Sequence, residues 1–282
     1  MTSIGHDTRV INDLIFDVGM HEGEDTAYYL TSGFRVIAID ADPNMIRLAR
    51  ENFSSYLDDG RLTILNSALS DKENEEATFY ISEQTEWSSL KRSISDRKSS
   101  LREVIKVKTR TLPSLMREFG TPYYCKIDVE GYDRICLQTL SMLKPLPPFM
   151  SVETECLGEH ETISEEQALE TLVELHNLGY RKFKLVCQED LTVLEPESRS
   201  FFKRIAPTSL ASKFARARTR WLSSSLGYDF RYGSTGPFGN DLGSEWLSYE
   251  SSRRTLLYHR RRYFKSRSAV NYGFWCDWHA KL

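Results

Sequence analysis

Short apolar runs and helical stretches alternate along the first 66 residues of the chain. Three runs are typical of buried strands, and segments with helical spacing separate them; the runs are LIFDV (14–18), RVIAID (35–40) and RLTILN (61–66). Apolar strands that alternate with helices are typical of a parallel sheet covered on both faces. The pattern therefore predicts an α/β fold with a mostly parallel sheet.

The alternation continues, with one interruption, to about residue 188. Two shorter runs flank a serine-rich polar stretch that we expect to be a loop, and three further strand-like runs follow; the five are 77–81, 104–109, 123–129, 149–154 and 181–188. Beyond residue 198 the pattern fades into a basic helical stretch and an aromatic, glycine-rich segment. We predict a main domain at 1–198 and an irregular or helical C-terminal extension at 199–282.

The formal net charge of −3 conceals an uneven distribution along the chain. Residues 1–198 carry a net charge of −14, whereas residues 199–267 carry +11. The basic segment could pack on the acidic body, or it could bind an anionic acceptor or nucleic acid. Because no RNA-binding signature is visible, nucleic acid is the least favoured of these partners.

Composition disfavours several classes of protein. The chain has no apolar stretch near the roughly 20 residues that cross a bilayer, and its first residues lack the basic and apolar segments of an export signal. The five cysteines are odd in number and widely spaced, with no CxxC pair, which argues against a disulfide framework or a structural zinc site. We expect a cytoplasmic protein without a membrane span.

The first predicted strand leads into the turn DVGMHEGEDT (17–26), which is rich in glycine and acid but has no lysine. Ligands of doubly wound sheets lie at this turn. The spacing of Gly19 and Gly23 matches neither a P-loop nor a GxGxxG fingerprint, and the acids would repel a pyrophosphate. S-adenosylmethionine has no phosphate and carries a sulfonium and an ammonium cation, so it fits an acidic turn.

The second predicted strand ends in Asp40, about 20 residues after the glycine turn, where an acidic side chain accepts hydrogen bonds from ribose hydroxyls. This position favours adenosine. The two glycines could also be simple turn residues, and Asp42 with Pro43 is better explained as an N-cap and N1 pair.

An ordered series of motifs between about residues 14 and 185 resembles the FkbM-type S-adenosylmethionine-dependent methyltransferases. The motifs are DVGMHEGEDT, VIAIDADP, NSALSD (66–71), SSL (88–90), VKTRTL (107–112), KIDVEGYD (126–133) and SVE (151–153). The resemblance implies a Rossmann-like, seven-stranded sheet of the class I methyltransferase type. It also implies S-adenosylmethionine as cofactor and O-methylation of sugar or polyketide hydroxyls.

The resemblance also assigns cofactor-binding positions. If the binding positions of the family are transferred to this sequence, the methionine portion would be held by Asp17, Gly19 and Gly23. The ribose would be held by Asp40, and the adenine edge by Ser67 and Ala68. The family usually has a small residue and asparagine where this turn has Met20 and His21, and commonly glutamate where it has Asp40. His21 could touch the cofactor, orient a carboxylate, transfer a proton or simply be accommodated in the turn.

Methyl transfer to a hydroxyl requires a base within hydrogen-bond reach of the oxygen. KIDVEGYD places Asp128 at the end of a strand beside the first, and Glu130 follows at period-two spacing, so that both side chains point to one side. We expect Asp128 to lie nearest the cofactor's amine or methyl group. Glu130 would be the base or an acceptor-hydroxyl ligand, although it could instead cap the following helix. Lys126 is expected to pair with an acid of a neighbouring strand.

Glu153, near the end of a later strand, is a third acid at the same rim. Three acids could bind a divalent cation or form a metal-free cluster, and the sequence leaves both open. His160 and His279 are alternative bases.

The sequence thus predicts a methyltransferase acting on a hydroxyl of a saccharide, glycan or specialised metabolite. The aromatic residues of the tail could cover the acceptor or simply pack; they are Tyr228, Phe230, Tyr232, Phe238 and Trp246. The alternatives are a non-catalytic glycan-binding or scaffold protein and, less favoured, an NAD-dependent oxidoreductase.

Overall fold

The computed structural model describes residues 9–154, 163–196, 225–265 and 275–282. The chain divides into two compact units, Met1–Met150 and Ser151–Leu282. The boundary predicted at residue 198 lies outside the described residues, so the division into 1–198 and 199–282 stays a prediction.

The first unit is built on four parallel strands in the order β7-β1-β2-β3. Their bounds are β1 (Val10–Val18), β2 (Arg35–Asp40), β3 (Leu62–Asn66) and β7 (Thr121–Ile127). The apolar runs are buried because helices cover both faces of the sheet. Val18 pairs with Ile39 and with Ile127, so the segments after β1, β2 and β7 leave the sheet at the same edge.

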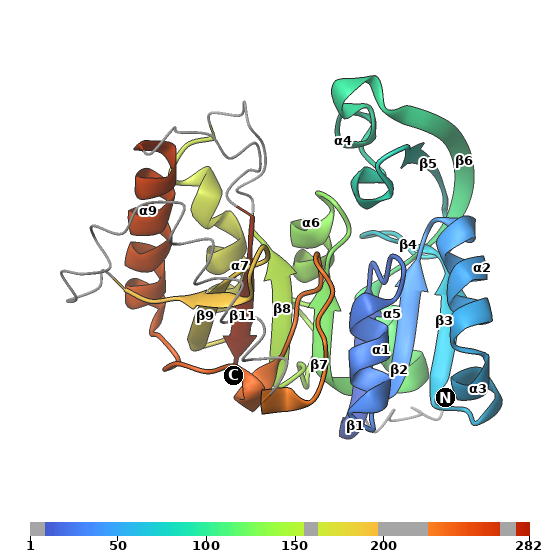
Figure 1. Cartoon of the computed structure of the whole chain (residues 1–282), viewed down its shortest axis with the longest axis horizontal. Helices are drawn as coiled ribbons and strands as arrows, with labels where there is room; N and C mark the ends of the chain where they lie inside the picture. Colours follow the sequence, from blue (N-terminus) through green and yellow to red (C-terminus); the bar gives the residue numbers. More distant parts are fainter. Residues whose placement is uncertain (1–8, 155–162, 197–224, 266–274) are drawn as a thin grey trace, which may run out of the picture. The chain divides into compact units, whose positions relative to one another are not determined.

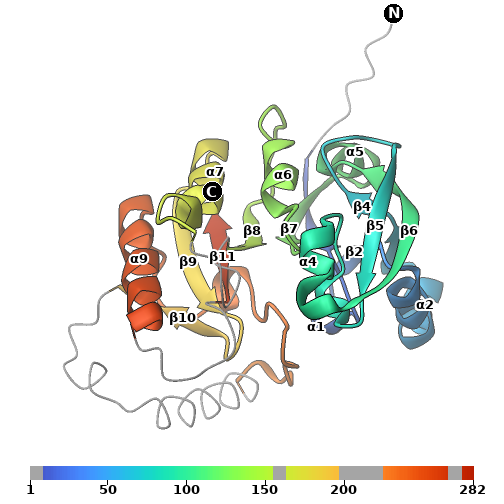
Figure 2. The ribbon, with the colours of Figure 1, turned by 90° about the horizontal axis from the view of Figure 1, so that it is seen from above.

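Five helices flank these strands, and Figure 2 shows α1 and α2 on one face and α5 and α6 on the other. Their bounds are α1 (Glu24–Thr31), α2 (Pro43–Asn52), α3 (Ser54–Asp58), α5 (Leu112–Phe119) and α6 (Asp133–Gln138). Asp42 accepts a hydrogen bond from the backbone N–H of Asn44, and Pro43 is the first helical residue of α2. The predicted N-cap and N1 pair is therefore confirmed.

A second, three-stranded sheet in the order β4-β6-β5 also belongs to the first unit; its strands are β4 (Ala68–Leu69), β5 (Glu76–Ser82) and β6 (Leu101–Arg110). The serine-rich stretch between β5 and β6 was expected to be a loop. It instead contains η1 (Thr85–Trp87), α4 (Arg92–Ser95) and η2 (Arg97–Ser99). Figure 1 shows the β5–β6 hairpin and α4 beyond the carboxyl ends of β1 and β2.

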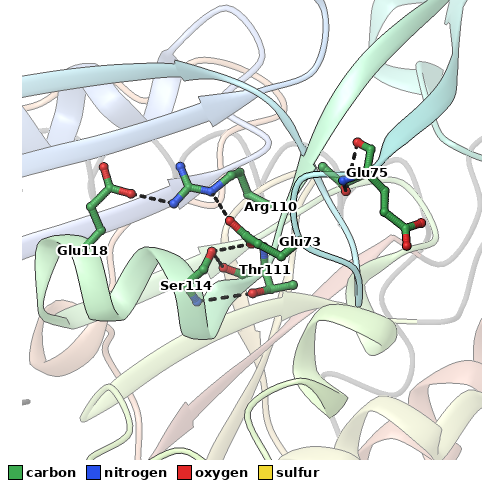
Figure 3. Close-up of polar contacts among 7 residues, drawn as sticks. Glu73, Glu75, Arg110, Thr111, Ser114 and Glu118 are labelled. Carbon is green, nitrogen blue, oxygen red and sulfur yellow. Dashed lines mark hydrogen bonds and ion pairs between the residues drawn. The ribbon is translucent and has the colours of Figure 1, made fainter. Parts of the chain in front are cut away.

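Glu73 fastens the segment before β5 to the start of α5 (Figure 3). Its carboxylate accepts hydrogen bonds from the Arg110 Nε at 2.8 Å, the Thr111 backbone N–H at 2.7 Å and the Ser114 hydroxyl at 2.6 Å. Arg110 also donates to Glu118 at 2.6 Å. This network fixes the edge of the second sheet to the helix that leads into β7.

In the second unit, β9 (Lys182–Cys187) pairs antiparallel with β10 (Thr192–Leu194) and with β11 (Cys276–Lys281). The division between the units falls within β8 (Phe149–Glu153). Among the described residues of this unit, the named helical elements are η3 (Gln167–Leu169), α7 (Glu170–Leu178), η5 (Gly239–Asp241) and α9 (Tyr249–Lys265). β11 was not foreseen in the predicted extension; its residue Trp278 is fully buried.

Two arginines of the run RRR at 260–262, in the basic segment, are engaged within this unit. Arg261 forms a two-bond ion pair with Glu165, and Arg260 donates to the Ile163 carbonyl at 2.6 Å. These contacts favour packing of the basic helix α9 over binding of an anionic acceptor there. The RARTR cluster at 216–220 lies outside the described residues.

Two sequence expectations concern the whole chain. In the ranges that the structure covers, no helix has both the length and the apolar character needed to cross a membrane. The cysteines within those ranges, Cys125, Cys136, Cys187 and Cys276, are free.

Candidate cofactor and active site

The turn after β1 is held against β2 and β7 by its backbone. The N–H groups of Gly19 and Met20 donate to the Ile39 carbonyl at 2.9 and 3.1 Å. Gly19 has a φ of +81°, and a Cβ there would lie 1.7 Å from the carbonyl oxygen of Asp128. Only glycine allows this close approach, so the residue has a packing role besides the cofactor contact that the sequence predicted.

Gly23 has a similar constraint at the start of α1. Its φ is +87°, and a Cβ would lie 2.5 Å from the ring of Phe53. Gly23 therefore allows Phe53, which lies between α2 and α3, to pack against the turn.

Lys126 of β7 lies at the centre of a buried acidic cluster. Its Nζ is 3.5 Å from an Asp17 carboxylate oxygen, 3.6 Å from Asp25 and 3.5 Å from Asp128, and it donates to the Gly19 carbonyl at 3.0 Å. The predicted pairing of Lys126 with an acid of a neighbouring strand is confirmed. One lysine facing three acids leaves the cluster with an excess of negative charge when the acids are ionised.

Asp17 is fully buried within this cluster, whereas the Asp128 side chain is 24% exposed. The Thr26 hydroxyl donates to Asp17 Oδ2 at 2.6 Å. Burial raises the pKa of Asp17, against the opposing effect of the Lys126 charge. A further positive charge would therefore stabilise the ionised form of Asp17.

Asp40 ends β2 and organises two segments of backbone. Its carboxylate accepts the N–H of His21 at 2.9 Å and the N–H of Asp42 at 2.8 Å. Burial raises the pKa of Asp40 to about 6 despite these two bonds. A carboxylate has about four acceptor positions, so Asp40 keeps capacity for ribose hydroxyls.

His21 lies in the left-handed region, with a φ of +51°. Among residues with a side chain, Asn, Asp and His are enriched there, which explains why histidine can replace the asparagine common in the family. Its Nε2 is 2.8 Å from the Thr85 hydroxyl, and its Nδ1 is 3.7 Å from Glu24. Burial lowers the pKa of His21, but the Glu24 hydrogen bond and the charges of Glu24 and Asp40 outweigh it, so the net shift is upward.

Glu130 follows β7 in a left-handed conformation, with a φ of +47°. Its Oε2 is buried and makes no hydrogen bond to any residue that the structure describes. Burial, followed by the charge of Asp128, raises the pKa of Glu130 well above its ordinary value.

Glu130 does not cap α6. Tyr132 occupies the N-cap position, and Asp133 instead accepts the N–H groups of Val129 and Gly131, both at 2.9 Å. Burial raises the pKa of Asp133 to about 6. Sequence reasoning missed Asp133; its place at the start of a helix, three residues after Glu130, is the signal that could have found it.

Ser67 and Ala68 follow β3. The Ser67 N–H donates to the Asp40 carbonyl at 3.0 Å, so Ser67 lies beside the predicted ribose-binding residue. Ala68 is 4% exposed and packs with Phe79 and Val107 in the core of the second sheet.

Several candidate residues belong to the second unit. Glu153 ends β8 with a buried side chain, and its role beside Asp128 and Glu130 stays a prediction. His279 lies in β11 opposite Lys184, and burial together with the Lys184 charge lowers its pKa to about 3. A base of such low pKa accepts protons poorly near neutrality. His160 lies outside the described residues.

The aromatic segment of the tail packs against β9 of its own unit. Phe230 and Phe238 are buried, whereas Tyr232 is 66% exposed. Lys184 donates to the Leu242 and Gly243 carbonyls at 2.6 and 3.1 Å, and its Nζ lies 4.4 Å from the centre of the Trp246 ring. These contacts favour packing over a carbohydrate-binding cover for much of the segment.

Comparison with known families gives a match to the methyltransferase FkbM domain over residues 17–182. This range includes each predicted cofactor-binding residue and the catalytic candidates His21, Asp128, Glu130 and Glu153, whereas the alternative base His279 lies outside it. No curated protein matches the chain.

Several solved structures are distantly similar. A precorrin-6y C5,15-methyltransferase from Geobacter metallireducens GS-15 is 11% identical, over 64% of this chain and 70% of its own, with a TM-score of 0.35. Phosphoethanolamine N-methyltransferase 2 of Haemonchus contortus, in complex with S-adenosyl-L-methionine, is 12% identical, over 98% of this chain and 50% of its own, with a TM-score of 0.39. The StiE O-MT structure is 9% identical, over 95% of this chain and 68% of its own, with a TM-score of 0.39.

Proposed function

The chain belongs to the FkbM methyltransferase family, whose cofactor is S-adenosylmethionine, and we propose that it methylates a hydroxyl oxygen of a saccharide, glycan or specialised metabolite. The proposal rests on two sets of acidic side chains at the carboxyl ends of the parallel strands of the first unit. One is the cluster around Lys126, and the other is Glu130 with its buried carboxyl group.

The residues fit a cationic ligand without phosphate. Asp17, Asp25 and Asp128 outnumber Lys126, so their excess negative charge would attract the ammonium and sulfonium groups of the cofactor. Asp40 would accept hydrogen bonds from the ribose hydroxyls, and Ser67 with Ala68 would border the adenine. A pyrophosphate would be repelled by the same acids, which disfavours an NAD-dependent oxidoreductase.

When bound, S-adenosylmethionine supplies an electrophilic methyl group on its sulfonium. The protein must hold the acceptor oxygen and take its proton. Glu130 is our choice for this base because burial and the Asp128 charge raise its pKa, which makes its carboxylate form a stronger proton acceptor. His21 is less suited, since both of its ring nitrogens face protein groups.

We place the reaction in the cytoplasm, because free cysteines at positions 125, 136, 187 and 276 suit a reducing compartment. The acceptor would be a small molecule or glycan. An anionic acceptor is disfavoured by the acids around Lys126 and by the engagement of Arg260 and Arg261 in contacts of their own.

Calorimetric titration with S-adenosylmethionine, S-adenosylhomocysteine and NAD tests the cofactor site. We expect micromolar binding of the first two ligands and none of NAD, with binding abolished in Asp17→Ala and Asp40→Ala. Transfer of tritium from methyl-labelled cofactor to a panel of neutral methyl glycosides, with anionic nucleotide sugars as the disfavoured comparison, then tests the reaction.

Glu130→Gln should keep cofactor affinity and lose turnover. Full turnover in that variant would refute the assigned base. Cofactor binding without transfer to any hydroxyl in the panel, combined with binding of a glycan, would instead favour a non-catalytic glycan-binding protein.

A further inference from the structure

The segment between β5 and β6 contacts both loops of the candidate site. Thr85 places its hydroxyl 2.8 Å from the Nε2 of His21, in the turn after β1. Ser89 donates its hydroxyl to the carbonyl oxygen of Glu130 at 2.7 Å. Figure 1 shows this segment, which includes α4, beyond the carboxyl ends of the strands. A part of the chain that the sequence predicts to be a loop therefore has polar contacts with two predicted functional residues.

Ser89 is itself firmly held. It is fully buried, and its backbone N–H and carbonyl exchange hydrogen bonds with Tyr80 of β5 at 3.0 and 2.9 Å. The Ser89 hydroxyl also accepts the N–H of Lys91 at 2.9 Å. Since the acceptor role of the hydroxyl is met by Lys91, its single proton is directed to Glu130. Ser89 thus connects the second sheet to the loop after β7.

Glu130 is a residue whose backbone needs such support. A left-handed conformation is unfavourable for a residue other than glycine, and it persists only where the surroundings enforce it. Asp133 binds the N–H groups on either side of Glu130, at Val129 and Gly131. Ser89 binds the carbonyl of Glu130 itself, so both edges of this turn are restrained.

Packing at the next residue adds a steric restraint from the same segment. Gly131 has a φ of +86°, and a Cβ there would lie 2.5 Å from Cδ1 of Ile94. Ser89 and Ile94 both belong to residues 83–100. This segment therefore restrains the backbone from which the Glu130 side chain extends.

We propose that Ser89 is a positioning residue that sets the direction of the Glu130 carboxyl group by binding the Glu130 backbone carbonyl. The inference rests on the proposed role of Glu130 in methyl transfer. It predicts that the hydroxyl of Ser89 affects turnover through Glu130 while leaving cofactor binding unchanged.

Ser89→Ala tests the proposal, and Ser88→Ala is its matched control. Ser88 lies in the same segment, and its hydroxyl accepts the N–H of Ser82, the last residue of β5, at 3.2 Å. With the acceptor found by the tritium panel, we expect kcat to fall about 10- to 100-fold in Ser89→Ala, because a small displacement of a catalytic group has effects of this size. The KM and Kd for S-adenosylmethionine should stay within about twofold of the wild-type values. Ser88→Ala should behave like the wild type.

A double-mutant cycle separates positioning from a general loss of structure. If Ser89 acts through Glu130, then Ser89→Ala should cause no further loss of the residual kcat that remains in a Glu130→Gln background. An equal loss in both backgrounds, or an unchanged kcat in the single variant, would overturn the proposal.

Amide hydrogen exchange gives a readout that needs no acceptor. The amides of residues 129–132 should exchange faster in Ser89→Ala than in Ser88→Ala, while those of β1 and β2 stay unchanged. If the panel yields no acceptor, the proposed function fails, yet this exchange pattern still decides whether Ser89 restrains the Glu130 turn. Unchanged exchange at 129–132 would refute that restraint.

Discussion

Single residues at the site were predictable where a strand end fixes their place. Asp17, Asp40 and Asp128 lie at the carboxyl ends of parallel strands, which the alternation of apolar runs already indicates. The partners Thr85, Ser89 and Asp133 were not predicted, because their contacts depend on how the hairpin and the β7 loop fold. Local sequence gives the position of an acid, but long-range packing gives its hydrogen bonds.

Gly19 allows a test of the close approach between two loops. Gly19→Ala should lower the free energy of unfolding by about 3 kcal/mol or more, because it adds a steric overlap with the Asp128 carbonyl to the cost of a positive φ. Gly33→Ala is the control, since Gly33 has a φ of +90° and nothing within 4 Å of the added Cβ. That variant should lose only about 1–2 kcal/mol. Equal losses by urea denaturation would contradict the proposed overlap.

Asp40 should make cofactor binding depend on pH. Its pKa in the free protein is raised to about 6, and the carboxylate is the form that accepts two ribose hydroxyls. Affinity for S-adenosylhomocysteine should therefore rise about fivefold from pH 5 to pH 6 and about a further twofold above the pKa of Asp40, where it levels off. Calorimetry across this range provides the measurement.

Two variants test whether Asp40 causes this pH dependence of affinity. Asp40→Asn should bind weakly and with little change between pH 5 and pH 7. His21→Asn keeps the backbone N–H that donates to Asp40 and removes the imidazole. Its pH dependence should therefore persist, displaced to slightly higher pH because the His21 charge no longer lowers the pKa of Asp40. A flat profile in His21→Asn would transfer the effect to the histidine.

At the scale of elements, strong apolar runs were predicted well and short helices were not. The run at 35–40 matches β2 (Arg35–Asp40). The stretch between β5 and β6 forms three short helical pieces, two of whose residues, Lys98 and Ser99, have a positive φ that no periodicity signals. β11 had a usable signal, since Cys276, Trp278 and Ala280 alternate with polar residues. The structure also buries the polar residues Asp277 and His279, which that alternation does not indicate.

The Glu73 network should stabilise the junction between the second sheet and α5. Burial raises the pKa of Glu73, but hydrogen bonds from Ser114 and Thr111 and the Arg110 charge outweigh it and lower the pKa overall. A lowered pKa in the folded state contributes stability above the ordinary value of 4.5, and this stability is lost as the pH falls through the folded-state pKa. Glu73→Gln should therefore cost about 1 kcal/mol at pH 7, and less at pH 3.

Glu75→Gln is the control for that measurement. Figure 3 shows the Glu75 carboxylate directed away from the network, and its ion pair with Lys72 is exposed. Exposed pairs contribute about 0–1 kcal/mol, so we expect a smaller effect on thermal unfolding. A loss in Glu75→Gln as large as that in Glu73→Gln would show that general charge, rather than the Glu73 contacts, stabilises this junction.

At the scale of the whole molecule, the two units should respond differently to the cofactor. The acidic cluster, Asp40 and the Glu130 loop belong to the first unit, and a ligand at 100 times its Kd stabilises the state that binds it by about 2.7 kcal/mol. S-adenosylhomocysteine should therefore slow amide exchange in β1, β2 and the turn at 17–26. The strands β9 and β11 should change less. The protection should be absent in Asp40→Ala, and NAD in place of S-adenosylhomocysteine should give none. Protection confined to β9 and β11 would place the cofactor outside the acidic turn.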